Sequence, residues 1–191
     1  MNWLITDKGD QDCRRLADKH YSRQTVGSPQ FTRNGQNLVF ITADLKAVWV
    51  TFRPTPGKAE RMDGLDAWEC SLFRNTGKEI ASELIAEALT LSCALWGPLP
   101  IDGMITSVNP DKIELIKRRG EPLPGFCFLK AGWTPFGFDA SGRPRFRAPR
   151  IEEWPHWSEW KWRGDRGGKL RRELEMDCMF AGADEGGKEK A

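Results

Sequence analysis

Arg74, Gly77 and Lys78 lie between a segment with strand-like alternation and a segment with helical periodicity. A helix N-terminus leaves backbone N–H groups unpaired and carries a partial positive charge, so it binds phosphate well. Glycine lets a phosphate approach the backbone, and the two cations can bond to its oxygens. The spacing predicts a phosphate site, but it is equally consistent with a plain strand–turn–helix connection whose cations are solvated.

A second polar group, His20-Tyr21-Ser22-Arg23, ends a predicted helix and leads into a glycine-containing loop. Tyr21 is the only tyrosine of the chain, and His20 is one of two histidines. Both residue types serve as general acids or bases when they lie at a cleft. In the alternative interpretation, His20 and Arg23 bond to carbonyl groups at a helix C-terminus, and Tyr21 packs on the core.

The C-terminal part of the chain combines tryptophans with cations. Trp154, Trp157, Trp160 and Trp162 lie close together, and Lys and Arg outnumber Asp and Glu in residues 143–172. Aromatic rings stack on unpaired bases, while cations neutralise phosphates. The segment 143–172 therefore predicts a nucleic-acid partner; the alternative is that its tryptophans anchor the segment on the core.

The composition is that of a globular protein, with 191 residues, 39% of them hydrophobic and 29% charged. No segment approaches the roughly 20 apolar residues that cross a bilayer, and the N-terminus lacks a signal-peptide pattern. We expect no membrane partner and a cytoplasmic location. The five cysteines are scattered, so a zinc site of the usual spacing is not expected, and Cys70, Cys93 and Cys127 are predicted to be buried.

Helices and strands that position these residues follow from the periodicity of the chain. Helices are predicted over 10–21, with Asp10 as its cap, over 76–95, and from Pro110 to about 119. Thr76 and Glu79 are interpreted as a capping box. Strands are predicted over 37–43, 47–53, 66–74, 102–108, 125–131, 133–138 and 144–147.

The strand–helix–strand unit at 66–108 requires a parallel pair, whereas the early strands, joined by short turns, pair antiparallel. The predicted fold class is α/β, in detail an α+β mixed sheet flanked by helices. We expect an α/β domain over 1–150, a Trp-rich basic extension over 151–180 and a disordered tail over 181–191.

The pattern Arg74-x-x-Gly77 before the long helix, followed by the strand at 102–108 and by residues 125–133, resembles the GCN5-related N-acetyltransferase superfamily. The resemblance covers about residues 37–138. It implies an acetyltransferase-like central mixed sheet with one splayed strand, whose end and following helix bind acetyl-CoA or a related acyl-CoA. The cofactor-binding residues that it implies are Leu72, Arg74, Asn75, Gly77, Lys78 and Ser82.

The sequence departs from that family at two points. Glu79 replaces the second small residue of the family's phosphate-binding pattern, and the frequent general-acid tyrosine after the fourth strand is absent. The His-Tyr-Ser segment ahead of such a core is similar to phage-associated proteins related to the Mom family, which modify adenine in DNA and in which iron has been implicated. This resemblance implies a nucleobase acceptor and allows for an iron ion, for which the sequence identifies no ligands.

The candidate catalytic residues are His20, Tyr21, Ser22, Glu69 and Asn109. Glu69 lies on the strand beside the expected acyl group, and Asn109 ends the next parallel strand, where ligands bind in open α/β sheets. His20 or Glu69 is expected to deprotonate the acceptor amine. The leading hypothesis is an acyl-CoA-dependent transferase that modifies a nucleobase in DNA; the alternative is a non-catalytic nucleic-acid-binding protein on a degenerate acetyltransferase fold.

Overall fold

The computed structural model describes residues 1–55, 57, 61–113, 116–118, 121–153, 161 and 163. The chain forms the helices α1 (Gln11–Ala17), α2 (Ala81–Trp96) and α3 (Phe126–Lys130), a 3-10 turn at Pro110–Lys112, and the strands β1 (Trp3–Thr6), β2 (Gln36–Thr42), β3 (Ala47–Arg53), β4 (Trp68–Asn75), β5 (Met104–Ser107), β6 (Ile116–Arg118), β7 (Glu121–Leu123), β8 (Thr134–Phe138) and β9 (Pro144–Arg147).

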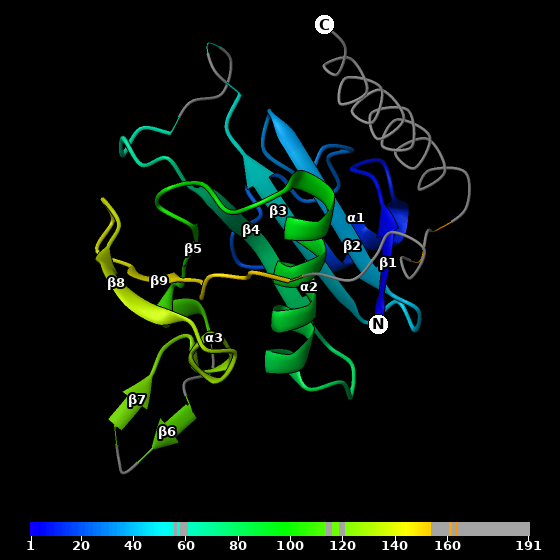
Figure 1. Cartoon of the computed structure of the whole chain (residues 1–191). Helices are drawn as coiled ribbons and strands as arrows, with labels where there is room; N and C mark the ends of the chain where they lie inside the picture. The colour runs from blue at the N-terminus through cyan, green and yellow to red at the C-terminus, as the bar shows by residue number, and fades with distance from the viewer. Residues whose placement is uncertain are drawn as a thin grey trace, which may run out of the picture.

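The main sheet has the strand order β1-β2-β3-β4-β5-β9-β8, and β6 and β7 form a separate hairpin (Figure 1). Every neighbouring pair of the main sheet is antiparallel except β4 and β5, which are parallel and joined through α2. The mixed sheet with flanking helices confirms the predicted α+β class.

Helices cover both faces of the sheet, which explains why β3 is hydrophobic at nearly every position. On one face, α2 buries Leu84, Ala88 and Leu91 in a cluster with Trp49 and Trp133. On the other face, Cys13 and Ala17 of α1 pack with a cluster that includes Val39, Val50 and Leu72. The sheet is therefore held from both sides at its centre.

The predicted start of α2 is wrong. The helix begins at Ala81, and its N-cap Ile80 makes no side-chain capping bond. Thr76 does not form a capping box, because its Oγ1 and its N–H both donate to the carbonyl of Lys46, each at 2.8 Å. The turn between β2 and β3 therefore fixes residue 76 outside the helix.

Two predictions after β5 are also wrong. The helix predicted from Pro110 is only a 3-10 turn, because the chain then pairs Ile116–Arg118 with Glu121–Leu123 as a hairpin. The predicted strand 125–131 is the helix α3, which follows Gly125 in a left-handed conformation with φ of 70°. A Cβ at residue 125 would lie 2.5 Å from the Phe146 ring, so glycine is required there. The strand β1 was not predicted at all.

Two residues near the C-terminus contact the edge of β1. Ile5 donates its N–H to the carbonyl of Lys161 at 2.7 Å, and Arg163 donates its N–H to the carbonyl of Ile5 at 2.9 Å. The guanidinium of Arg163 also forms ion pairs with Asp10, the N-cap of α1, and with Asp12. The cluster of four tryptophans and the tail 181–191 lie outside the described residues, so the predictions made for them stay predictions.

Within the described ranges, no helix combines the length and the hydropathy that crossing a membrane would require.

Candidate functional site

The parallel strands β4 and β5 separate soon after they meet. Only Trp68 pairs with Met104 and Glu69 with Ile105, whereas the register between β4 and β3 runs through to Asn75. One step further along, Thr106 Oγ1 donates to the carbonyl of Cys70 at 3.0 Å. Beyond this bond the strands diverge, and we call the opening between them the β4–β5 fork.

A β-bulge lies in β4 where the fork begins. Thr51 pairs with Cys70 and Val50 pairs with Leu72, so Ser71 is an extra residue on β4. A bulge shifts the alternation of side chains between the two faces of a sheet. Accordingly, Cys70 packs on the α2 face, whereas Leu72 packs on the α1 face. The bulge thus redirects the backbone of β4 at the mouth of the fork.

A large cleft of about 2140 Å³ includes the fork. It is bounded by the residues after α1, by β4 from Glu69 to Asn75, by the end of β5 and by the β8–β9 turn. Of the predicted site residues, the cleft is lined by His20, Tyr21, Ser22, Glu69, Leu72, Arg74 and Asn75. Gly77, Lys78, Ser82 and Asn109 are not part of its lining. The sequence therefore predicted one wall well, whereas Thr106 and the arginines of the opposite wall were not singled out as site residues.

The Tyr21 hydroxyl reaches the β5 side of the fork. It lies 3.5 Å from the carbonyl of Ser107, to which it can donate, and 3.4 Å from the N–H of Asn109, from which it accepts. In a parallel pair of strands, one residue bonds to a carbonyl and to an N–H of the neighbouring strand that lie two residues apart, as the groups of Ser107 and Asn109 do. The Tyr21 hydroxyl therefore takes the place of a β4 residue beside β5, but its two bonds are long and weak. Burial of Tyr21 raises the pKa of the phenol.

The imidazole of His20 lies against the Tyr21 ring with centroids 4.2 Å apart and the ring planes tilted by 32°. Its Nδ1 accepts from the backbone N–H of Ser22 at 3.2 Å and lies 2.7 Å from Ser22 Oγ. Burial, followed by the charge of Arg74, lowers the pKa of His20 to about 4. A neutral ring whose Nδ1 accepts carries its proton on Nε2, assigned here from the hydrogen bonds. His20 therefore presents a donor, and the expectation that it acts as a base does not fit this arrangement.

Arg23 has structural contacts, although the carbonyls to which it bonds lie in the following loop and not, as in the alternative interpretation, at the C-terminus of the helix. Its side chain is only 8% exposed and pairs with Asp18 at 2.7 Å. The same guanidinium donates to the carbonyls of Ser28 and Gln30, each at 2.6 Å. These contacts hold the loop that follows α1 and so fix the end of the segment that carries His20 and Tyr21.

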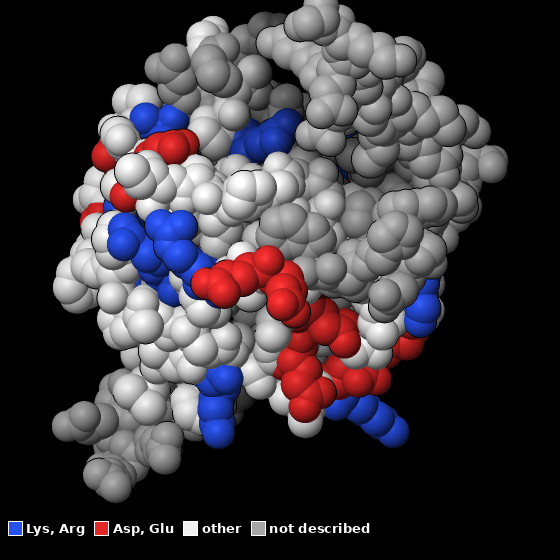
Figure 2. All heavy atoms as spheres, viewed as in Figure 1, with Lys and Arg blue, Asp and Glu red and all other residues white. Residues whose placement is uncertain are grey.

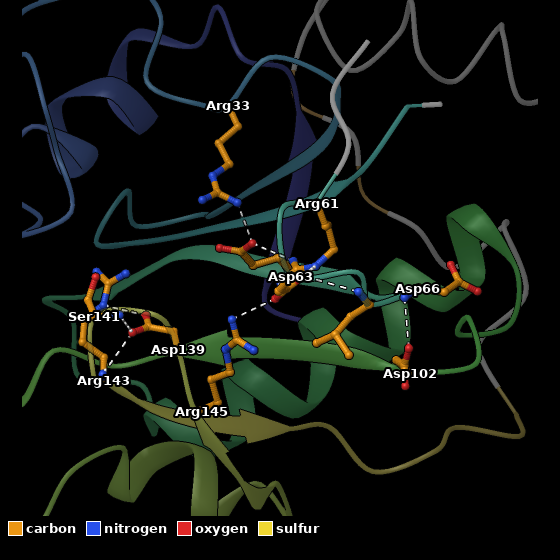
Figure 3. A network of polar contacts seen from close by, with 11 residues as sticks. Arg33, Arg61, Asp63, Asp66, Asp102, Asp139, Ser141, Arg143 and Arg145 are labelled. Atoms are coloured by element: carbon orange, nitrogen blue, oxygen red, sulfur yellow. Dashed lines mark hydrogen bonds and ion pairs between the residues drawn. The ribbon is translucent and has the colours of Figure 1, made fainter. Parts of the chain in front are cut away.

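Glu69 of β4 belongs to a network of charged side chains in which Figure 3 labels Arg33, Arg61, Asp63 and Arg145. Its Oε2 accepts from Arg33 at 2.6 Å and from Arg61 at 2.9 Å. Arg61 also pairs with Asp63, which in turn pairs with Arg145 at 2.8 Å. The hydrogen bond from Arg61 lowers the pKa of Asp63. Glu69 is engaged as a counter-ion of two arginines, so the expectation that it serves as a base does not fit its contacts either.

Asn75 organises the turn between β4 and α2. Its Nδ2 donates to the carbonyl of Glu79 at 2.7 Å, and its Oδ1 accepts from the N–H of Gly77 at 2.8 Å. A Cβ on Gly77 would lie 3.0 Å from Lys46 Cβ. Gly77 is thus explained by close packing on the β2–β3 turn, a reason other than the predicted approach of a phosphate.

The cysteines that the structure describes show no sign of activation. Cys70 and Cys93 are buried, as predicted, and Cys127 is partly buried. Burial raises the pKa of each of these thiols, which disfavours the reactive thiolate. Among the residues that the structure describes, no three His, Cys, Asp or Glu side chains are grouped so as to hold a metal ion.

Comparison of the chain with protein-family models, with curated proteins and with solved structures finds no match.

Proposed function

We propose that the protein is an acyl-CoA-dependent N-acyltransferase. The observation that carries the proposal is the β4–β5 fork, in which β4 continues to Asn75 after its pairing with β5 has ended at Glu69. An extended ligand with amide groups can bond to such a strand edge as an added strand does. The pantetheine arm of CoA is a ligand of this kind, and the bulge at Ser71 is a feature often found beside active sites.

The end of the fork leads directly to the N-terminus of α2. Because its N-cap Ile80 makes no side-chain capping bond, the first N–H groups of α2 are suited to a phosphate. Lys78 is exposed on the preceding turn and supplies a cation. In the proposal, the edge of β4 at Leu72 holds the pantetheine, while Asn75, Lys78 and Ser82 lie on the side of the phosphates.

The proposed reaction joins an acceptor amine to the thioester carbonyl. The C–N bond forms, the C–S bond breaks, the amine releases a proton to water in the cleft, and the departing thiolate takes up a proton. His20 Nε2–H is suited to stabilise the negative charge on the carbonyl oxygen, since a neutral donor needs no counter-ion. The Tyr21 hydroxyl at the β5 side is suited to protonate the thiolate.

For the acceptor we propose an exocyclic amine of a nucleobase in DNA. Figure 2 shows basic side chains gathered near β8 and β9 and acidic side chains over α2. Arg33, Arg61, Arg143 and Arg145 line the cleft, although each also pairs with a carboxylate. These arginines suit a substrate that carries phosphates. Since the described residues offer no grouped metal ligands, we derive no step through iron.

Isothermal titration with acetyl-CoA tests the cofactor, with ADP as a ligand that has phosphates but no pantetheine. We expect acetyl-CoA to bind at least about tenfold more tightly than ADP, because only acetyl-CoA can pair with the edge of β4. Lys78→Glu should weaken acetyl-CoA binding, whereas Lys130→Glu, which makes the same charge change at the exposed end of α3, should not. Equal binding of the two ligands, or none, would contradict the proposal.

The alternative function, a nucleic-acid-binding protein without a cofactor, is favoured by the basic side chains near β8 and β9. A labelled DNA oligonucleotide followed by fluorescence anisotropy separates the two functions. Salt-dependent DNA binding together with no acetyl-CoA binding would support the alternative. Transfer of a labelled acetyl group to the oligonucleotide would support the enzyme.

A further inference from the structure

Arg74 lies on β4 inside the fork, but its guanidinium is not directed at the turn that precedes α2. Its Nη1 donates to the carbonyl of Lys19 at 2.7 Å, across 55 positions of the chain. Lys19 immediately precedes His20 and Tyr21, whose rings are in contact. One bond therefore joins the strand on one side of the fork to the segment 19–22, which we call the His20 segment.

The His20 segment is attached to both sides of the fork. On the β4 side it is held by Arg74, and on the β5 side by the hydroxyl of Tyr21 at Ser107 and Asn109. The β4 contact is short at 2.7 Å, whereas the β5 contacts are 3.5 and 3.4 Å. Arg74 is thus the stronger of the two attachments.

The guanidinium of Arg74 is incompletely bonded by the residues that the structure describes. Its Nε is buried and has no hydrogen-bond partner among the described residues. Arg23, which directly follows the His20 segment, differs from Arg74, because its Nε, Nη1 and Nη2 all donate to protein oxygens. A partly exposed guanidinium with an unused Nε donor in a cleft is suited to receive an anion.

We propose that Arg74 is a positioning residue that holds the His20 segment over the fork and passes to a phosphate group of the bound cofactor, so that cofactor binding releases the β4 side of the segment while the Tyr21 hydroxyl keeps its contacts on the β5 side. This inference rests on the proposed function for the identity of the ligand. The Lys19 carbonyl and a phosphate would compete for the same guanidinium. A phosphate that bonds to its N–H groups therefore weakens the bond to Lys19. The position of His20 and Tyr21 then depends on whether the cofactor is present.

The charge of Arg74 adds a second, independent readout. It contributes, after burial, to the low pKa of His20. Other charged residues near the His20 segment are Asp18, which is paired with Arg23, Lys19 itself, and Arg143, whose charge acts on Tyr21. Because the chain has only two histidines, the His20 signal can be followed by NMR and assigned with the variant His20→Asn.

Hydrogen exchange of residues 18–23 and the NMR titration of His20 test the proposal in the full chain. In Arg74→Gln without ligand, we expect at least about tenfold faster exchange in the segment and a higher pKa of His20. Arg74→Lys should keep the low pKa of His20 and still show faster exchange, because lysine retains the positive charge but lacks the planar set of guanidinium donors. Lys130→Gln, an equal loss of charge elsewhere, should change neither quantity.

The probe for release is CoA. In the wild type, CoA should accelerate exchange in the His20 segment, whereas in Arg74→Gln it should cause no further acceleration. Unchanged exchange in ligand-free Arg74→Gln would overturn the positioning role. Bound CoA without an effect on wild-type exchange would overturn the release. Absence of CoA binding would overturn the proposed function and the release with it, while the ligand-free comparison still decides whether Arg74 holds the segment.

Discussion

The two edges of β4 differ sharply. The edge toward β3 is paired from Glu69 to Asn75 with one bulge, and Trp49 lies directly opposite Phe73. The edge toward β5 is paired at only two positions, and Thr106 adds one side-chain bond to the Cys70 carbonyl. The Tyr21 hydroxyl bonds to Ser107 and Asn109 on the β5 side and so leaves this edge of β4 unpaired. One edge is satisfied by backbone partners and carries stability, while the other leaves backbone groups for a ligand. Substitutions on the two sides should therefore have different consequences.

The largest effect on stability is expected on the paired edge. Trp49 is fully buried, meets Phe73 and Trp133 edge to face, and donates its Nε1–H to Thr51 Oγ1. Trp49→Ala should lower the free energy of unfolding by about 3–5 kcal/mol, since it removes a large side chain from a packed cluster. Urea denaturation followed by circular dichroism measures the loss. The exposed Val26→Ala is the control, and an equal loss in both variants would contradict the comparison.

The next effect is a loss of stability in acid at the unpaired edge. The pKa of His20 is lowered from 6.5 to about 4, so the folded state disfavours its protonation. Its contribution to stability is fully present above about pH 6.5 and is lost as the pH falls toward 4. Between about pH 7 and pH 4.5, the wild type should lose about 2 kcal/mol more than His20→Asn. Urea midpoints at both pH values measure this, and parallel losses would show that the folded state does not disfavour protonation of His20.

A smaller effect is expected where the fork begins. Thr106→Val keeps the shape of the side chain but removes the hydrogen bond to the Cys70 carbonyl, which should cost about 1 kcal/mol. Hydrogen exchange at Cys70 and Ser71 should accelerate, because the fork can then open further. Thr90→Val is a matched control, since its hydroxyl bonds only to the Ala86 carbonyl within α2. Similar results for the two variants would remove the special role of Thr106.

Periodicity predicted the strands of the paired edge well. The strand 47–53 was located to the residue, and 37–43 within one residue, because their apolar runs are bounded by turn residues. The four-residue β1 was missed, since a short strand at a chain end has few residues to show alternation. The start of α2 was missed because Thr76 bonds to Lys46, a contact made across 30 residues that no local pattern contains.

The candidate site was predicted only in part, because here too the deciding contacts join residues that are remote in the sequence. His20, Tyr21 and Arg74 stood out by residue type and do line one cleft, but their roles depend on partners remote in sequence. Tyr21 meets Asn109 across 88 positions, and Arg74 meets Lys19 across 55. Glu69 illustrates the limit most clearly, because its two arginine partners turn an expected base into a counter-ion.

The smallest effect tests why residue 77 is glycine. An added Cβ would lie 3.0 Å from Lys46 Cβ and 3.2 Å from Asp44 Oδ2, on the side of the β2–β3 turn. Gly77→Ala should therefore cost up to about 1 kcal/mol of stability through a small shift of that turn. Its affinity for acetyl-CoA should stay within about twofold of the wild type, because the added carbon does not face the cleft.

Urea denaturation and isothermal titration on the same Gly77→Ala sample separate these two quantities. A stability loss with unchanged affinity would mean that glycine is required at residue 77 for packing on the β2–β3 turn. A tenfold loss of affinity at unchanged stability would instead restore the interpretation in which the phosphate approaches the backbone at residue 77. The ligand-binding region would then continue from the edge of β4 past Asn75 into the turn that precedes α2.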